Sequence, residues 1–87
     1  MHVMFEVVLA PGALGEGLIS QETLKDTQAQ VMTREEAEQV GFQGIPDDPH
    51  GRDRRFVVVA KRDERRIMNQ LEANPEVAGF QPHYVDI

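Results

Sequence analysis

Histidine and carboxylate side chains near the two ends of the chain are the residues best suited to do chemistry. His2 lies close to the start of the 87-residue sequence, and His83 and Asp86 lie close to its end. Two imidazoles and a carboxylate can bind a metal ion or act as a general acid and base, if the first and last strands are neighbours. The sequence does not show that they meet, so separate surface positions for His2, His50 and His83 are the favoured interpretation.

A second group of candidate ligands lies in one turn-rich segment, where Asp47, Asp48, His50 and Asp53 follow one another closely. Carboxylates beside an imidazole can bind a divalent cation. Their spacing does not match a helix-flanked calcium loop, and a solvated turn is the favoured interpretation. The chain has no cysteine, its single serine is Ser20, and no catalytic motif occurs. We therefore expect a protein without catalytic activity or cofactor, with a small metal-binding protein or enzyme as one alternative.

Residues 11–17 form a glycine-rich loop after the first expected strand. Their spacing, G-x-x-G-x-G, matches neither the dinucleotide fingerprint nor a P-loop. Glu16 would also repel a phosphate at this position. A turn that binds no phosphate is the favoured interpretation.

The charge of the chain is distributed unevenly. The net charge is −6, yet residues 1–48 hold nine acidic and two basic side chains, whereas residues 49–87 hold six acidic and seven basic ones. These seven residues, called the basic patch here, are Arg52, Arg54, Arg55, Lys61, Arg62, Arg65 and Arg66. Such a patch could bind the phosphates of a nucleic acid, but it flanks both ends of an expected strand and would be split into two groups roughly 17 Å apart.

An acid–base partnership is the other interpretation of the basic patch. Glu35, Glu36 and Glu38 make one expected helix the most acidic element of the chain, and this acidic helix could meet the arginines inside the protein or across a dimer. We therefore favour a protein partner or a second copy over nucleic acid. The same glutamates, together with Asp47 and Asp48, leave a third alternative open, an inhibitor that imitates nucleic acid.

The second half of the chain has the clearest periodicity. Residues 56–60 are a continuous apolar run rich in β-branched side chains, which predicts a central strand covered on both faces. Asp63 can cap the following helix of about 10 residues. The apolar side of that helix consists of Ile67, Met68 and Leu71. Residues 77–87 predict a closing strand, and Pro82 favours an edge position for it.

The first half is less regular. Residues 3–10 alternate between a clearly apolar and a mixed face, which predicts a strand. Residues 18–32 allow a short helix, followed either by more helix or by a short strand. Thr33 and Glu36 match a capping box at the start of the acidic helix, and Gly41 suits the left-handed position at its end.

Length and composition limit the classes of protein that remain. A chain of 87 residues predicts one domain, residues 1–87, whose modest core would benefit from oligomerisation. No apolar run is long enough to span a membrane. The first residues lack a basic segment and include Glu6, so they do not have the pattern of a secretory signal. We therefore expect a cytoplasmic protein without membrane contact.

The order of the expected elements predicts an α+β protein of the ferredoxin-like α/β plait type, an antiparallel sheet with helices packed on one face. That architecture does not define a function, because it hosts many. The absence of catalytic motifs and the uneven charge favour a non-catalytic interaction or regulatory module that forms a homodimer. Nucleic-acid binding through the basic patch is the main alternative.

Overall fold

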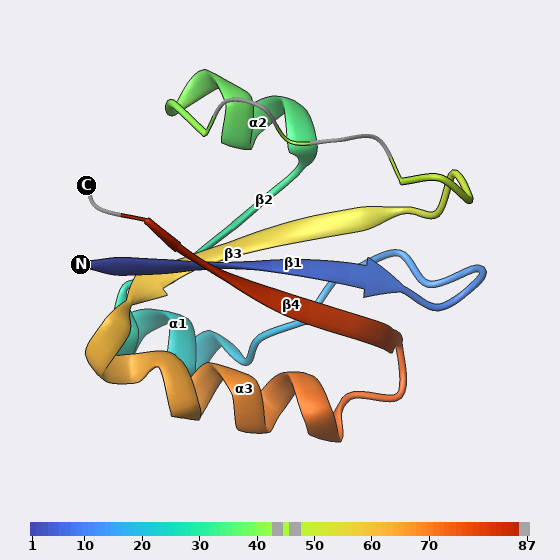
Figure 1. Cartoon of the computed structure of the whole chain (residues 1–87). Coiled ribbons are helices and arrows are strands. Elements are labelled where there is room, and N and C mark those ends of the chain that lie inside the picture. Colours follow the sequence, from blue (N-terminus) through green and yellow to red (C-terminus); the bar gives the residue numbers. More distant parts are fainter. Residues whose placement is uncertain (43–44, 46–47, 86–87) are drawn as a thin grey trace.

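Four antiparallel strands form one sheet in the computed structural model, which describes residues 1–42, 45 and 48–85 (Figure 1). The strands lie in the order β2-β3-β1-β4, and all neighbours are antiparallel. Their bounds are β1 (His2–Leu9), β2 (Gln30–Met32), β3 (Arg54–Ala60) and β4 (Val77–Val85). The helices are α1 (Gln21–Thr27), α2 (Arg34–Gln39), the 3-10 helix η1 (Lys61–Asp63) and α3 (Glu64–Ala73). These elements confirm the prediction of a small α+β protein with an antiparallel sheet.

The alternation of β1 places one row of apolar side chains under α1 and α3. Val3 and Phe5 are fully buried and lie opposite Val59 and Val57 of β3. The α3 side chains that pack against this row are Ile67 and Leu71, both buried as the sequence predicts, while Met68 is partly buried. Burying each large apolar side chain contributes roughly 1.5–3 kcal/mol, so α3 is held by the sheet rather than by its own helix propensity.

Polar contacts join α1 to α3. The Ser20 side chain accepts a hydrogen bond from the backbone of Thr23 and so caps α1. Gln70 of α3 donates to the hydroxyl of Thr23, and Arg66 lies 3.1 Å from Asp26. The two helices therefore form one layer on the same face of the sheet (Figure 1).

α2 lies on the opposite face, which corrects the prediction that the helices pack on one face (Figure 1). The reason is that the second face of the central strands is also apolar, since Met4 of β1 and Phe56 of β3 point to it. The cover supplied by α2 and the chain after it consists of Ala37, Phe42 and Ile45. The capping box of Thr33 and Glu36 is present, as the sequence predicts.

Three local expectations have clear outcomes. Gln28 has a left-handed φ of 57°, which ends α1, so that the ambiguous segment after it is the strand β2. Asp63 occupies the position before α3 but makes no capping hydrogen bond, because η1 precedes the helix; the predicted carboxylate cap is therefore wrong. Pro82 lies in β4, which pairs only with β1 among the described strands, and this confirms the edge position.

No helix among the described residues is long and apolar enough to cross a membrane.

Candidate functional site

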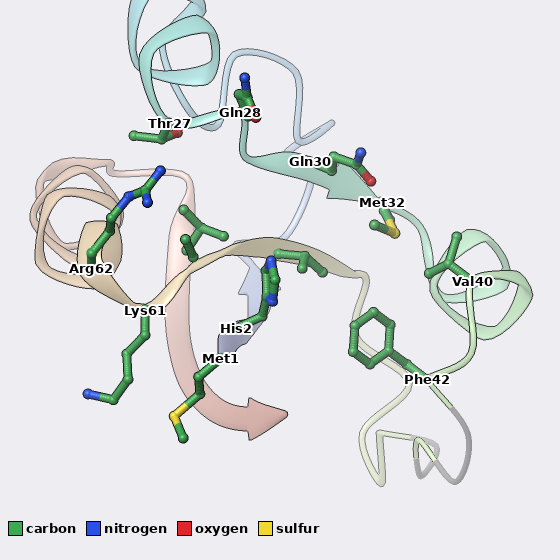
Figure 2. Close-up of a pocket in the computed structure, with 13 residues that line it drawn as sticks. Met1, His2, Thr27, Gln28, Gln30, Met32, Val40, Phe42, Lys61 and Arg62 are labelled. Carbon is green, nitrogen blue, oxygen red and sulfur yellow. The ribbon is translucent and has the colours of Figure 1, made fainter. Parts of the chain in front are cut away.

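A hollow of about 660 Å³ lies beside the end of β3 and the chain that follows α2 (Figure 2). It exists because β2 is only three residues long: β2 begins opposite Val58, so Val59 and Ala60 have no strand on that side among the described residues. We call it the α2–β3 hollow. Its apolar lining consists of Met1, Met32, Val40, Phe42, Val58, Val59 and Ala60, and its polar lining of His2, Thr27, Gln28, Gln30, Lys61 and Arg62.

His2 brings an unsatisfied polar atom to the α2–β3 hollow. Its Nδ1 is buried and has no hydrogen-bond partner among the described residues. A buried polar atom without a partner is uncommon and unfavourable. Because this nitrogen is closed to solvent, a group in the hollow does not reach it unless neighbouring side chains move.

The charged side chains at the α2–β3 hollow are basic. Lys61 and Arg62 line it, and none of its lining residues in the described part of the chain is acidic. Lys61 lies 3.8 Å from Glu64, and Arg62 lies 3.6 Å from Asp63. Both basic side chains are exposed, at 52% and 85%, and such surface pairs are weak. Arg62 is therefore available to an anion at the hollow, whereas the Lys61 ammonium lies 5.5 Å from the centre of the Tyr84 ring, which does not line the hollow.

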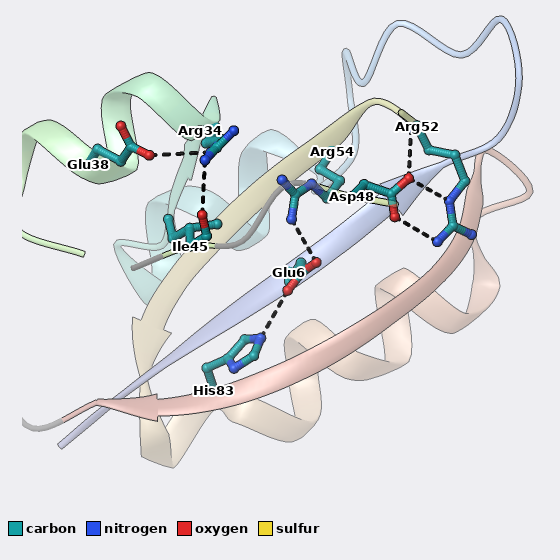
Figure 3. Close-up of polar contacts among 8 residues, drawn as sticks. All are labelled: Glu6, Arg34, Glu38, Ile45, Asp48, Arg52, Arg54 and His83. Atoms are coloured by element: carbon teal, nitrogen blue, oxygen red, sulfur yellow. Dashed lines mark hydrogen bonds and ion pairs between the residues drawn. The ribbon is translucent and has the colours of Figure 1, made fainter. Parts of the chain in front are cut away.

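A polar network crosses the same face of the sheet (Figure 3). Glu6 of β1 accepts a hydrogen bond from Arg54 of β3 at 2.9 Å and contacts His83 of β4 at 3.1 Å. The Arg54 guanidinium also lies 5.5 Å from the centre of the Phe56 ring. Arg54 is buried, so this member of the basic patch is used inside the protein.

Arg52 is also occupied within its own turn. Its guanidinium donates two hydrogen bonds to the Asp48 carboxylate, at 2.8 and 3.0 Å, and its backbone donates a third at 2.7 Å (Figure 3). These hydrogen bonds hold the pKa of Asp48 well below its ordinary value of 3.8. Asp48 is therefore a structural partner of Arg52, while Asp47 lies outside the described residues.

Arg55 holds the glycine-rich loop. It donates a hydrogen bond to the carbonyl of Leu14 at 3.3 Å and another to the carbonyl of Arg54 at 2.8 Å. A Cβ at Gly15 would lie 3.2 Å from the Arg55 side chain, and Gly15 has a φ of 79°. The left-handed φ and the close approach of Arg55 both favour glycine at position 15 for structural reasons.

The rest of the basic patch surrounds the start of α3. Lys61, Arg62, Arg65 and Arg66 are exposed, and we call them the basic turn. The acidic helix is α2, whose three glutamates, Glu35, Glu36 and Glu38, are also exposed. Glu36 is occupied in the capping box, and Glu38 lies 3.3 Å from Arg34.

The chain-end histidines lie on neighbouring strands, since β1 pairs with β4. His83 contacts Glu6 rather than joining His2 in a metal set, and the described residues contain no group of three possible metal ligands. Asp86 lies outside the described residues. The structure therefore gives this candidate set no shared site among the residues it describes.

Sequence reasoning missed both the α2–β3 hollow and the pairing of Glu6 with Arg54. The one available signal for the pair was a charged residue inside an otherwise apolar strand, which needs a partner when it is covered. The hollow had no sequence signal, because it depends on where a three-residue strand begins.

Comparisons of this chain with protein-family models, with curated proteins and with solved structures found no match. The function proposed below therefore depends on the contacts, charges and exposure of the described residues.

Proposed function

We propose that this chain is a small, non-catalytic interaction module that self-associates, with the acidic helix of each copy facing the basic turn of the other. One observation carries the proposal: the two charged elements lie on opposite sides of the sheet. α2 packs on one face, and α3, which follows the basic turn, packs on the other (Figure 1). A second copy can bring these opposite charges together.

The contacts of the basic turn support its availability. Lys61 pairs with Glu64, Arg62 with Asp63, and Arg66 with Asp26, and none of these acidic partners belongs to α2. Exposed ion pairs of this kind contribute about 0–1 kcal/mol each. These ion pairs can therefore be replaced by contacts with a second copy at a small cost in free energy.

Exposed apolar side chains accompany both charged elements. Val40 follows the acidic helix and is 60% exposed, and Tyr84 is 57% exposed and lies under Lys61 of the basic turn. In a two-fold dimer each α2 and Val40 would face the partner's Lys61 and Tyr84, so both contacts form twice. A stable interface buries about 800 Å² per partner, roughly a seventh of the 5563 Å² surface of this chain.

We further propose that the architecture is a ferredoxin-like α/β plait with α2 added between β2 and β3. The antiparallel order β2-β3-β1-β4 supports this assignment, as does the layer of α1 and α3 on one face. α2 on the opposite face is the departure from the simple pattern. As a result, the second face of the sheet is partly covered by α2 instead of being fully open.

Sedimentation velocity tests the self-association directly. The wild-type chain is measured from low micromolar to about millimolar concentration, at low and at high salt. We expect a dimer whose dissociation constant rises with salt, because the opposed charges are screened. A chain that stays monomeric over the whole range would contradict the proposal.

A titration of labelled DNA and RNA in a salt series tests the main alternative. Arg62→Glu and Lys25→Glu form a matched pair, because each changes the charge by the same amount and only Arg62 belongs to the basic turn. We expect no salt-dependent binding by the wild type. Binding that weakens steeply with salt, and that Arg62→Glu reduces more than Lys25→Glu, would replace self-association by nucleic-acid binding.

A further inference from the structure

We propose that Tyr84 of one copy enters the α2–β3 hollow of the other copy when the chain self-associates. This inference rests on the proposed self-association and deepens it, because it names the side chain that fills the hollow. Three features support it, namely the exposure of Tyr84, the lining of the hollow and the place of the hollow between the two charged elements.

Tyr84 is an exposed aromatic side chain in a chain that covers its other aromatic rings. It is the single tyrosine, beside four phenylalanines and no tryptophan. Tyr84 is 57% exposed, whereas all four phenylalanines are buried or half-buried. Tyrosine is among the residue types that most often carry binding energy when they enter a pocket of a partner. The exposed ring therefore suits a contact with a second protein surface.

Two contacts hold the Tyr84 ring in one orientation. Its hydroxyl donates a hydrogen bond to Glu64 at 2.5 Å, and the Lys61 ammonium lies 5.5 Å from the centre of the ring. A side chain that is already ordered loses little conformational freedom on binding. Tyr84 is thus presented to a partner as a fixed projection.

The apolar part of the hollow suits the ring of a tyrosine. Met32, Phe42 and Val58 form a wall that continues into the core under α2 (Figure 2). Aromatic rings pack favourably against aromatic and thioether side chains of this kind. A ring on this wall removes apolar surface of both copies from water.

The polar part of the hollow suits the hydroxyl of a tyrosine. Gln28 and Gln30 line the hollow and are exposed. A tyrosine hydroxyl that donates to Glu64 can still accept a hydrogen bond, and a glutamine amide can donate one. An apolar wall with uncharged polar groups beside it therefore matches tyrosine better than an aliphatic side chain.

The hollow lies where the proposed interface brings the partner's Tyr84. Val40 at the end of the acidic helix and Arg62 of the basic turn both line it. In the proposed two-fold dimer, Val40 faces the partner's Lys61 and Tyr84, so that ring lies at the mouth of the hollow. Tyr84 does not line the hollow of its own copy. A second copy therefore has to supply it, and the symmetry fills both hollows.

Tyrosine fluorescence tests the burial of the ring, because Tyr84 is the only fluorescent aromatic residue of its kind in a chain without tryptophan. Acrylamide quenching is measured over the same concentration range as sedimentation velocity. We expect the quenching constant of the dimer to be several-fold lower than that of the monomer. A dimer with unchanged quenching would overturn this inference and leave self-association intact. A chain that stays monomeric would overturn both.

Ala60→Phe locates the ring in the hollow, because Ala60 lines the hollow and a larger side chain there takes up its space. We expect the dissociation constant of the dimer to rise about tenfold. Ala73→Phe is the matched control, since Ala73 is exposed in α3 and does not line the hollow. Equal dissociation constants for the two variants, with an amide spectrum that shows both folded, would overturn the placement.

Variants of Tyr84 itself complete the test and leave the hollow unchanged. Tyr84→Ala should weaken the dimer about thirtyfold, as for an anchor residue. Tyr84→Phe keeps the ring and should weaken it only a few-fold. Leu14→Ala is the control at another exposed apolar side chain, 71% exposed and outside the hollow. A loss in Tyr84→Ala no larger than that in Leu14→Ala would overturn the proposal.

Discussion

Glu6 on β1 and Arg54 on β3 form an ion pair of 2.9 Å across the centre of the sheet. The Arg54 side chain is 6% exposed and the Glu6 side chain 20% exposed, so most of this pair is removed from water. His83 contacts the second oxygen of the same carboxylate. Because both oxygens of Glu6 have partners, this charged side chain can lie on the sheet face that α2 covers.

Glu6→Gln should destabilise the protein strongly, because it leaves the buried Arg54 charge without a counter-charge. We expect a loss of about 3 kcal/mol, as for a broken buried pair, measured by urea unfolding. Adding Arg54→Met should recover most of that loss. His83→Gln, at a side chain that is 40% exposed, should cost less than about 1 kcal/mol. Equal losses from Glu6→Gln and His83→Gln would contradict this account.

Phe56→Ala should be as damaging as Ile67→Ala, because both side chains are fully buried although they face opposite sides of the sheet. We expect losses of about 3–5 kcal/mol and 2–5 kcal/mol in chemical unfolding. Leu14→Ala is the exposed control and should change stability by less than about 0.5 kcal/mol. A nearly neutral Phe56→Ala would show that α2 does not cover the second face.

Thr33→Ala should loosen α2 by removing the hydroxyl that accepts from the Glu36 backbone. The expected loss is about 1 kcal/mol, visible as faster amide hydrogen exchange in α2. Glu36→Gln keeps a side-chain acceptor for the Thr33 amide and should behave almost like the wild type. If both variants exchange alike, the capping box is not what holds the start of α2.

Asp48→Asn should remove a stabilisation that depends on pH. The hydrogen bonds from Arg52 lower the pKa of Asp48 below 3.8 in the folded chain. A lowered carboxylate pKa stabilises the fold above the ordinary pKa, and this contribution is lost as pH falls through the folded pKa. The difference in unfolding free energy between wild type and variant should therefore be constant near neutral pH and shrink below about pH 4. A difference that stays constant down to about pH 2 would contradict this.

Local periodicity was enough to predict several elements. The alternation in β1, the continuous apolar run in β3 and the apolar side of α3 each reflect contacts that one short segment makes with the core. The capping box at Thr33 was predictable for the same reason, because its partners are three residues apart. Such features depend on neighbours in the sequence.

Long-range pairings were not predictable in the same way. Glu6 and Arg54 are 48 residues apart, so their contact requires the register of β1 against β3. The face that α2 covers depends on Met4 and Phe56 sharing one side of the sheet, which the sequence of either strand does not decide alone. The α2–β3 hollow depends on the late start of β2 opposite Val58. These features arise from the assembled sheet.

A charge-exchange experiment tests self-association through α2 and the basic turn most directly. One variant carries Arg62→Glu and Arg65→Glu, and the other carries Glu35→Lys and Glu38→Lys. Each should be monomeric in sedimentation velocity at concentrations where the wild type is a dimer, because its two facing surfaces then have the same sign. An equimolar mixture should form a dimer again, since both contacts between unlike copies become favourable. Variants that dimerise alone as the wild type does, or a mixture that stays monomeric, would contradict the proposed interface.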